Sequence, residues 1–111
     1  MFRDKSYLED IVESAKLAIS FCEGVSFEQF AESKKDQASV LYEIAVIGEA
    51  ARLLSEEIKL SHPEIPFKEI KGMRNKVIHE YRHVLVDRLW GVVQKDLPKL
   101  IEDIQAILKG I

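Results

Sequence analysis

The segment from Arg74 to Tyr81 reads Arg-Asn-Lys-Val-Ile-His-Glu-Tyr and combines a fixed cation, an imidazole and a phenol. His79 follows Arg74 by five positions, and Tyr81 follows His79 by two. A guanidinium binds phosphate as a planar fork, and an imidazole transfers protons near neutral pH. This set of residues favours chemistry on a phosphate group.

Helical spacing places these residues on two faces. At about 100° per residue, Arg74 and Tyr81 fall on the same arc as a row of apolar residues. That row consists of Phe67, Ile70, Met73, Val77 and Val84. Asn75, His79 and Arg82 point about 100–140° away from Arg74. One straight helix therefore does not direct Arg74 and His79 at the same phosphate.

Arg74 on an apolar face needs a partner, because burying an unpaired cation is costly. In a structural interpretation, Arg74 pairs with a carboxylate inside the fold, such as Glu43 or Glu49, and Tyr81 packs with its hydroxyl at the rim. In a functional interpretation, Arg74 and His79 line a groove for a phosphate. An unwound helix end near His79, or a second copy of the segment, would then bring the two groups together.

The remaining chain has the pattern of helices that could hold this segment. Apolar residues at three-four spacing predict helices over residues 4–22, 36–59, 66–81 and 87–108. Ser26 and Gln29 have the spacing of a capping box, which predicts a short extra helix. No β-type alternation and no internal repeat is visible. The sequence therefore predicts an all-α fold, an antiparallel four-helix bundle with one short extra helix, in a single domain over residues 1–111.

Helix-breaking residues mark the predicted boundaries. Gly24 would end the first helix. Pro63 and Pro66 interrupt the helical pattern, since each disfavours helix in the residue before it, and Pro66 suits the first turn of the next helix. Asp87 is the candidate N-cap of the last helix. Pro98 lies inside that helix, where it should kink or loosen it.

Composition indicates an ordinary globular chain. Of the 111 residues, 47% are hydrophobic and 32% are charged, which argues against disorder. The apolar runs are too short to span a bilayer, and no signal peptide is visible. The single cysteine, Cys22, excludes an internal disulfide framework and fits core packing and a reducing cytoplasm. We therefore expect a cytoplasmic protein without membrane contact.

Charge is unevenly distributed along the chain. The whole chain has a net charge of −3, whereas residues 68–88 contain six basic and three acidic residues, a net +3. A basic segment on an acidic body favours contact with a polyanion, although a solvated helix face would have the same composition. Lys76 and Arg82 lie within or next to the segment from Arg74 to Tyr81 and are its nearest additional cations.

The order of several short motifs resembles the HepT branch of the HEPN-domain ribonucleases. The signature of those ribonucleases is an Arg, often followed by a polar residue, with a His after four to six residues, and the HepT branch adds a Tyr two positions later. Further agreement lies in residues 47–51 (Ile-Gly-Glu-Ala-Ala), 63–66 (Pro-Glu-Ile-Pro), 72–75 (Gly-Met-Arg-Asn), 86–87, 89–90 and 96–98. The resemblance covers nearly the whole chain. Phe67 departs from it, since the family commonly has Trp there, but this is a conservative packing change.

The resemblance implies a HEPN bundle that dimerises and so joins two Arg–His motifs in one cleft. It also implies an endoribonuclease that needs no metal and no cofactor. Arg74 would hold the scissile phosphate and stabilise its developing charge, and His79 would act as general acid or base on the ribose 2′-hydroxyl or the leaving oxygen. Asn75 would orient the phosphate or the His, while Lys76 and Arg82 would contact the RNA.

The sequence has no pattern typical of a metal site. His62, His79 and His83 lack a closely spaced set of acidic or cysteine ligands. We expect His62, which precedes Pro63, to be a loop residue. We expect Trp90 to pack in the core rather than to stack on bases.

The resemblance further implies a toxin–antitoxin pair. In this branch the toxin is paired with a small nucleotidyltransferase that adenylylates the Tyr of the motif, which is Tyr81 here. The added AMP would place bulk and negative charge beside Arg74 and His79 and would block RNA. Two alternatives stay open: a non-catalytic module that binds nucleotide or a nucleotidyltransferase partner, and a helical dimerisation domain without chemistry of its own.

Overall fold

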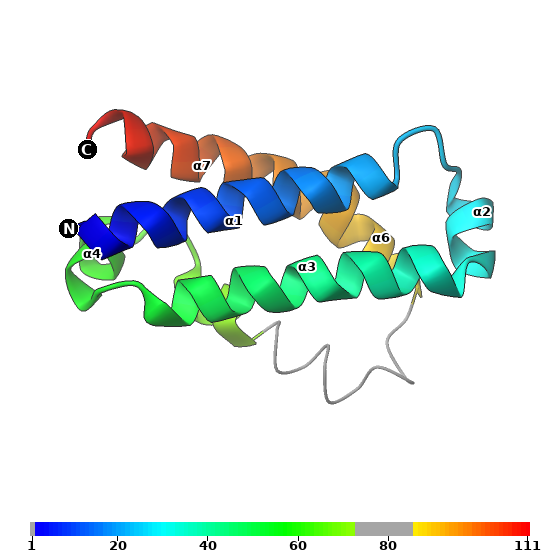
Figure 1. Ribbon diagram of the computed structural model, residues 1–111, viewed down its shortest axis with the longest axis horizontal. Helices are drawn as coiled ribbons and strands as arrows, with labels where there is room; N and C mark the ends of the chain where they lie inside the picture. Colours follow the sequence, from blue (N-terminus) through cyan, green and yellow to red (C-terminus); the bar gives the residue numbers. More distant parts are fainter. Residues whose placement is uncertain (1, 73–85) are drawn as a thin grey trace.

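The computed structural model describes residues 2–72 and 86–111, and all statements about structure concern this part of the chain. Three long helices form the body of the fold: α1 (Phe2–Phe21), α3 (Lys34–Leu53) and α7 (Leu97–Lys109) (Figure 1). α1 runs antiparallel to both α3 and α7 and packs against each of them. Every described element is helical, so the all-α prediction is confirmed. None of the described helices is both long and apolar enough to cross a membrane.

Shorter helical segments connect the long helices. They are α2 (Phe27–Glu32), α4 (Glu56–Ser61), α6 (Val86–Gly91) and the π-helix η2 (Val92–Asp96). A further helix begins at residue 67 and is described through residue 72. This is the start of the helix predicted over residues 66–81, and the rest of that prediction lies outside the described residues.

The core lies where the apolar spacing predicts it, between α1, α2, α3 and α7. Its largest fully covered side chains are Leu8, Ile11, Phe30, Val40, Ile44, Ile47, Leu97 and Ile104. Burying one side chain of this size stabilises the fold by about 1.5–3 kcal/mol. Cys22 is also buried, as predicted, and this burial, together with the charge of Asp36, raises the pKa of its thiol.

The connection from α1 to α2 is formed by the two features that the sequence predicts there, a glycine that ends α1 and a capping box that starts α2. Gly24 has a φ of +70°, a left-handed conformation that glycine adopts without strain. The Ser26 hydroxyl accepts a hydrogen bond from the Gln29 amide at 3.1 Å, and the Gln29 side-chain oxygen accepts one from the Ser26 amide at 2.9 Å. This reciprocal pair is the predicted capping box, and it starts α2.

The helix predicted over residues 36–59 is divided, and the prediction of one continuous helix is wrong. α3 ends at Leu53, and α4 begins at Glu56. The Asp4 carboxylate accepts hydrogen bonds from the Ser55 amide at 2.8 Å and from the Ser55 hydroxyl at 2.6 Å. In a continuous helix, the Ser55 amide would bond to the Ala51 carbonyl instead. The Ser55 hydroxyl also accepts a bond from the Ile58 amide at 3.3 Å and so starts α4 as its N-cap.

The proline-rich connection breaks the helical pattern as predicted. His62 is the C-cap of α4 and lies in the connecting loop, with its Nδ1 3.3 Å from a Glu64 carboxylate oxygen. The Ile70 amide donates to the Pro66 carbonyl at 3.0 Å. Pro66 is therefore the N-cap of the next helix, which begins at residue 67. The prediction had placed Pro66 one position later, in the first turn of that helix.

The helix predicted over residues 87–108 is divided into α6, η2 and α7. Asp87 lies inside the first turn of α6, so the prediction that it is the N-cap is wrong, because Val86 is already helical. Pro98 has no N–H for the carbonyl of Gln94. Instead, the Leu97 amide donates to the Val92 carbonyl, five residues back, which makes this turn a π-helix. The loosening predicted at Pro98 is thereby confirmed.

Candidate functional site

The predicted site residues lie in the segment 73–85, outside the described residues. They are Arg74, Asn75, Lys76, His79, Tyr81 and Arg82, and the same holds for His83 and for Met73, Val77 and Val84 of the predicted apolar row. Their roles, and the division of the segment between two helix faces, stay predictions. The structure does describe the elements that precede and follow the segment, together with the carboxylates of α3.

The chain enters the segment from a firmly packed helix start. Phe67 and Ile70 are buried, and Ile65 is buried just before them. Phe67 is thus a core residue, which fits its role as a packing replacement for Trp. Lys68 and Lys71 of the same helix are exposed. The helix therefore presents cations to solvent while its apolar side holds it in the core.

The chain leaves the segment into an aromatic cluster. Leu89 of α6 is buried, and Trp90 packs against two phenylalanines of α2. The ring centroid of Trp90 is 5.3 Å from that of Phe30 and 6.0 Å from that of Phe27. The expectation that Trp90 packs with the core is confirmed. Arg88 is exposed on this helix.

Both candidate partners of Arg74 lie on α3. Glu49 binds Arg52 in a two-pronged ion pair, with its carboxylate oxygens 2.8 Å from Nε and 3.0 Å from an outer guanidinium nitrogen. Sequence reasoning missed this pairing, although the three-residue spacing is a signal for it. Glu43 is only 7% exposed, and no hydrogen bond joins its carboxylate to another described residue. Whether either carboxylate contacts Arg74 lies outside the described residues.

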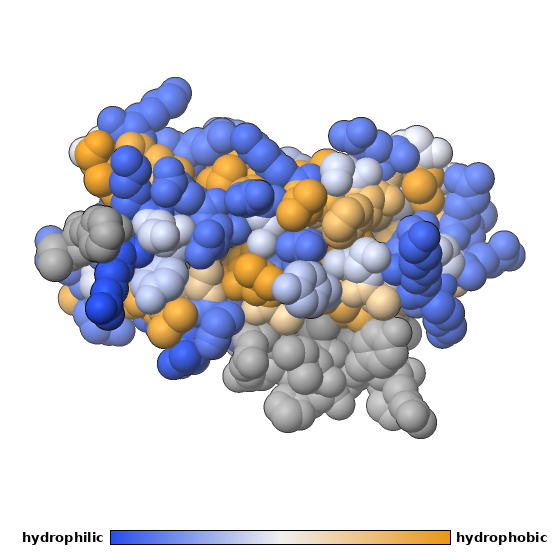
Figure 2. Space-filling model, in the orientation of Figure 1, coloured by the Kyte–Doolittle hydropathy of each residue, from blue (hydrophilic) through white to orange (hydrophobic). Residues whose placement is uncertain are grey.

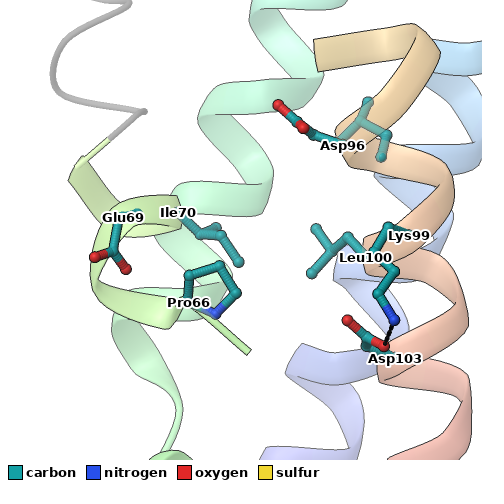
Figure 3. A pocket seen from close by; sticks show the side chains of 8 residues that line it. Pro66, Glu69, Ile70, Asp96, Lys99, Leu100 and Asp103 are labelled. Atoms are coloured by element: carbon teal, nitrogen blue, oxygen red, sulfur yellow. Dashed lines mark hydrogen bonds and ion pairs between the residues drawn. The ribbon is translucent and has the colours of Figure 1, made fainter. Parts of the chain in front are cut away.

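A cavity of about 330 Å³ lies on one side of the helical residues 67–72, facing the junction of η2 and α7 (Figure 3). Its lining includes the apolar Ile70, Leu97 and Leu100 and the carboxylates Glu69, Asp96 and Asp103. The Lys99 ammonium donates to Asp103 at 3.0 Å, and this bond raises the pKa of Lys99. The remaining carboxylates make this cavity unsuited to a phosphate.

A second, more open cavity of about 530 Å³ lies between α4 and the same helix. It is lined by three lysines, Lys59, Lys68 and Lys71, together with Glu56 and Glu69. Among contacts within the described residues, Lys59 is the one of these lysines that is paired, with its Nζ 3.7 Å from a Glu56 carboxylate oxygen. Of the two cavities, this lysine-lined one suits a polyanion better.

Metal ligands are not grouped in the described part of the chain. Over residues 2–72 and 86–111, no three His, Cys, Asp or Glu side chains are placed so that they could hold a metal ion together. His62, the one histidine in these ranges, lies next to Glu64 only.

Comparison with known proteins identifies the family. A family profile described as "Ribonuclease HepT-like" matches residues 11–107. The chain belongs to the HepT-like ribonuclease family. The match includes both packed flanks and the whole Arg74–Tyr81 segment. The predicted family and the prediction of a ribonuclease are confirmed.

Relatives of similar length support the same assignment. "Probable ribonuclease HepT" of Thermococcus cleftensis is 43% identical over 86% of this chain and 87% of its own. "Putative RNase MJ1380" of Methanocaldococcus jannaschii is 32% identical over 93% of this chain and 94% of its own. No solved structure matches the chain.

Proposed function

We propose that this chain is a metal-independent endoribonuclease toxin that acts in the cytoplasm as a homodimer, with residues 1–111 as one HEPN domain. The observation that carries the proposal is the membership in the HepT-like ribonuclease family over a range that contains Arg74, His79 and Tyr81. The chemistry would lie in the first two residues, and regulation would lie in the third.

The proposed reaction uses the RNA as its own nucleophile. His79 takes the proton of a ribose 2′-hydroxyl, and the 2′-oxygen forms a bond to the adjacent phosphorus while the bond to the 5′-oxygen breaks. The leaving oxygen takes up a proton, from the same imidazole or from a second His79 in the dimer. The products are a 2′,3′-cyclic phosphate and a 5′-hydroxyl. Arg74 holds the phosphate and stabilises the charge that develops on its oxygens, and Asn75 orients the phosphate or the imidazole.

The described flanks of the segment support contact with RNA. Lys68 and Lys71 are exposed on the helix that enters the segment, and Arg88 is exposed on the helix that leaves it. These cations extend the positive charge that Lys76 and Arg82 contribute inside the segment. Phosphate contacts from exposed lysines supply affinity without reading sequence.

Cleavage of a labelled single-stranded RNA in excess EDTA tests the proposal. We expect the purified protein to cut the RNA, and we expect Arg74→Ala and His79→Ala each to abolish cleavage. Arg3→Ala is the matched control, because it removes an exposed arginine of α1, outside the segment and its two flanking helices, and should keep most of the activity. A strand with 2′-deoxyribose at the cleaved position should resist cutting. RNA that stays intact at every protein concentration, with tight nucleotide binding retained, would instead favour the non-catalytic module.

The proposed antitoxin is a small nucleotidyltransferase that transfers AMP to Tyr81. Bulk and negative charge next to Arg74 and His79 would then exclude the RNA phosphate. Mass spectrometry after co-expression with such an enzyme should find one added AMP, and the modified protein should not cut RNA. Tyr81→Phe should remain unmodified, whereas Tyr42→Phe, which removes an exposed phenol on α3, should be modified like the wild type. AMP on any residue other than Tyr81 would contradict the proposed switch.

A further inference from the structure

The cavity between the helix at residues 67–72 and the start of α7 has apolar walls. Ile70, Leu97 and Leu100 line it, and all three residues are buried. Figure 3 shows the Ile70 and Leu100 side chains directed toward one another from its two walls. On the molecular face in Figure 2, by contrast, apolar side chains form small groups separated by hydrophilic ones, which is ordinary for a protein surface. The cavity is therefore the better-defined place for a ligand.

The size of the cavity limits its occupant to a small molecule. Its volume of about 330 Å³ lies at the lower end of the range for small-molecule sites, which extends from about 300 to about 1,000 Å³. Its apolar walls end at the exposed, charged residues Glu69, Asp96 and Lys99. A stable contact between two proteins buries more than about 1,000 Å² around an apolar centre, which is far broader than the apolar part of this cavity.

The charges at the cavity favour a cation. Its lining contains three carboxylates and one ammonium, a net charge of −2. The ammonium of Lys99 donates to Asp103 at 3.0 Å, so these two charges offset each other. Within the described part of the chain, Glu69 and Asp96 have neither a hydrogen bond nor an ion pair through their carboxylates. Two negative charges are therefore available to a ligand.

The positions of the two available carboxylates favour an extended organic cation. No three His, Cys, Asp or Glu side chains of the described residues are placed to hold a metal ion together, so the carboxylates of this cavity do not form a metal site. Glu69 stands on the wall formed by residues 67–72 and Asp96 on the wall formed by η2, and the side chains of Ile70 and Leu100 lie between these walls (Figure 3). A linear aliphatic diamine has the matching form, with an ammonium at each end and methylenes between them. Alkyl amines resemble the lysine side chain, whose pKa is about 10.4, and carry their protons at neutral pH.

We infer that this cavity binds a linear aliphatic diamine or a longer polyamine. One ammonium pairs with Glu69 and the other with Asp96, while the methylene chain lies against the apolar walls. The bound ligand contacts both the helix at residues 67–72 and the start of α7, so it stabilises the folded chain. The inference is independent of the proposed function, because described residues carry it and its test contains no RNA.

Isothermal titration calorimetry with 1,5-diaminopentane and with spermidine tests the inference. We expect one molecule to bind per chain, and we expect Asp96→Asn and Glu69→Gln each to raise Kd about threefold to fivefold, because each removes one exposed ion pair. Glu102→Gln is the matched control, since it removes an exposed carboxylate of α7 that does not line the cavity, and it should keep the wild-type Kd. A wild type that binds neither amine, or an Asp96→Asn protein with the wild-type Kd, would overturn the inference.

A series of amines on the wild type separates the contribution of the apolar walls from that of charge. 1,3-Diaminopropane has the same two charges as 1,5-diaminopentane, but its chain is shorter, and each methylene that enters the cavity should tighten binding by up to about fourfold. Pentylamine has the longer chain and one charge, and it should bind more weakly than 1,5-diaminopentane. The bound diamine should also raise the midpoint temperature of unfolding. Equal Kd values for the two diamines, or an equal rise in midpoint with Mg²⁺ at the same concentration, would show general screening of the acidic surface and would contradict a diamine site.

Discussion

The carboxylate of Asp4 accepts two hydrogen bonds from Ser55, from its amide at 2.8 Å and from its hydroxyl at 2.6 Å. Asp4 is buried at the start of α1, and Ser55 lies in the break between α3 and α4. This pair thus ends one helix, starts another and joins both to the N-terminal helix. It links residues 51 positions apart in the sequence.

Asp4→Ala should destabilise the protein, because the Ser55 amide would lose its partner in a half-buried place. Hydrogen bonds to a charged group contribute about 1.5–3 kcal/mol, so we expect a loss of about 2 kcal/mol in the free energy of unfolding. Urea denaturation followed by circular dichroism measures it. Asp10→Ala removes an exposed carboxylate from the same helix and should change stability by less than about 0.5 kcal/mol. Equal losses of unfolding free energy in the two variants would contradict the proposed contribution of the Asp4–Ser55 hydrogen bonds to stability.

Ser26→Ala removes the hydroxyl that caps α2. The loss of an N-cap costs about 1 kcal/mol, and we expect a decrease of this size in the free energy of unfolding. Ser6→Ala, an exposed serine inside α1, is the control and should be neutral or slightly stabilising, because alanine is the better helix former. The midpoints of urea denaturation of the two variants are compared with the midpoint of the wild type. A Ser26→Ala protein as stable as the wild type would show that the cap is dispensable.

The difference between these two pairs explains what could be predicted from the sequence. The Ser26–Gln29 capping box is made by residues three apart, so its spacing alone predicts it. The break at Leu54 and Ser55 depends on Asp4, which lies 51 positions from Ser55 in the sequence. No local sequence pattern predicts a contact between residues so far apart. The apolar spacing of residues 36–59 therefore predicts a helix there, but it extends that helix through a break that tertiary structure creates.

The functional segment shows the same limit in another form. The motif Arg74, His79, Tyr81 and its family could be recognised from residue types and spacing. The side-chain geometry that would join Arg74 to His79 depends on how the segment packs. Residue spacing alone does not distinguish between the several carboxylates with which Arg74 could pair. Glu49 illustrates this, because it was predicted only as a possible partner of Arg74, whereas the structure also pairs it with Arg52, three residues further along α3.

Cys22 makes stability depend on pH in the alkaline range. Burial, and secondarily the charge of Asp36, raises the pKa of its thiol above the ordinary value of 9.0. As the pH rises through the unfolded-state pKa, the unfolded chain loses the thiol proton before the folded one does, so the free energy of unfolding falls. We expect the wild type to lose more stability between about pH 8 and about pH 10 than Cys22→Ala does. Urea denaturation of both proteins at each pH measures the difference, and parallel curves would contradict the assignment.

Lys68 and Lys71 should contribute to RNA affinity through phosphate contacts alone. Each exposed lysine that neutralises one phosphate of a single strand changes the slope of log K against log salt concentration by about 0.7. We therefore expect Lys71→Ala to weaken binding of a non-cleavable 2′-deoxy strand at low salt, to reduce the salt slope by about 0.7, and to raise KM with kcat nearly unchanged. Fluorescence anisotropy over a series of salt concentrations measures the first two quantities, and cleavage kinetics measure the third. Lys99→Ala is the matched control, because Lys99 lies at the acidic cavity on the other side of the same helix and is bound to Asp103. An equal loss of affinity in both variants would mean that net charge, and not the lysine-lined side of the helix, attracts the RNA.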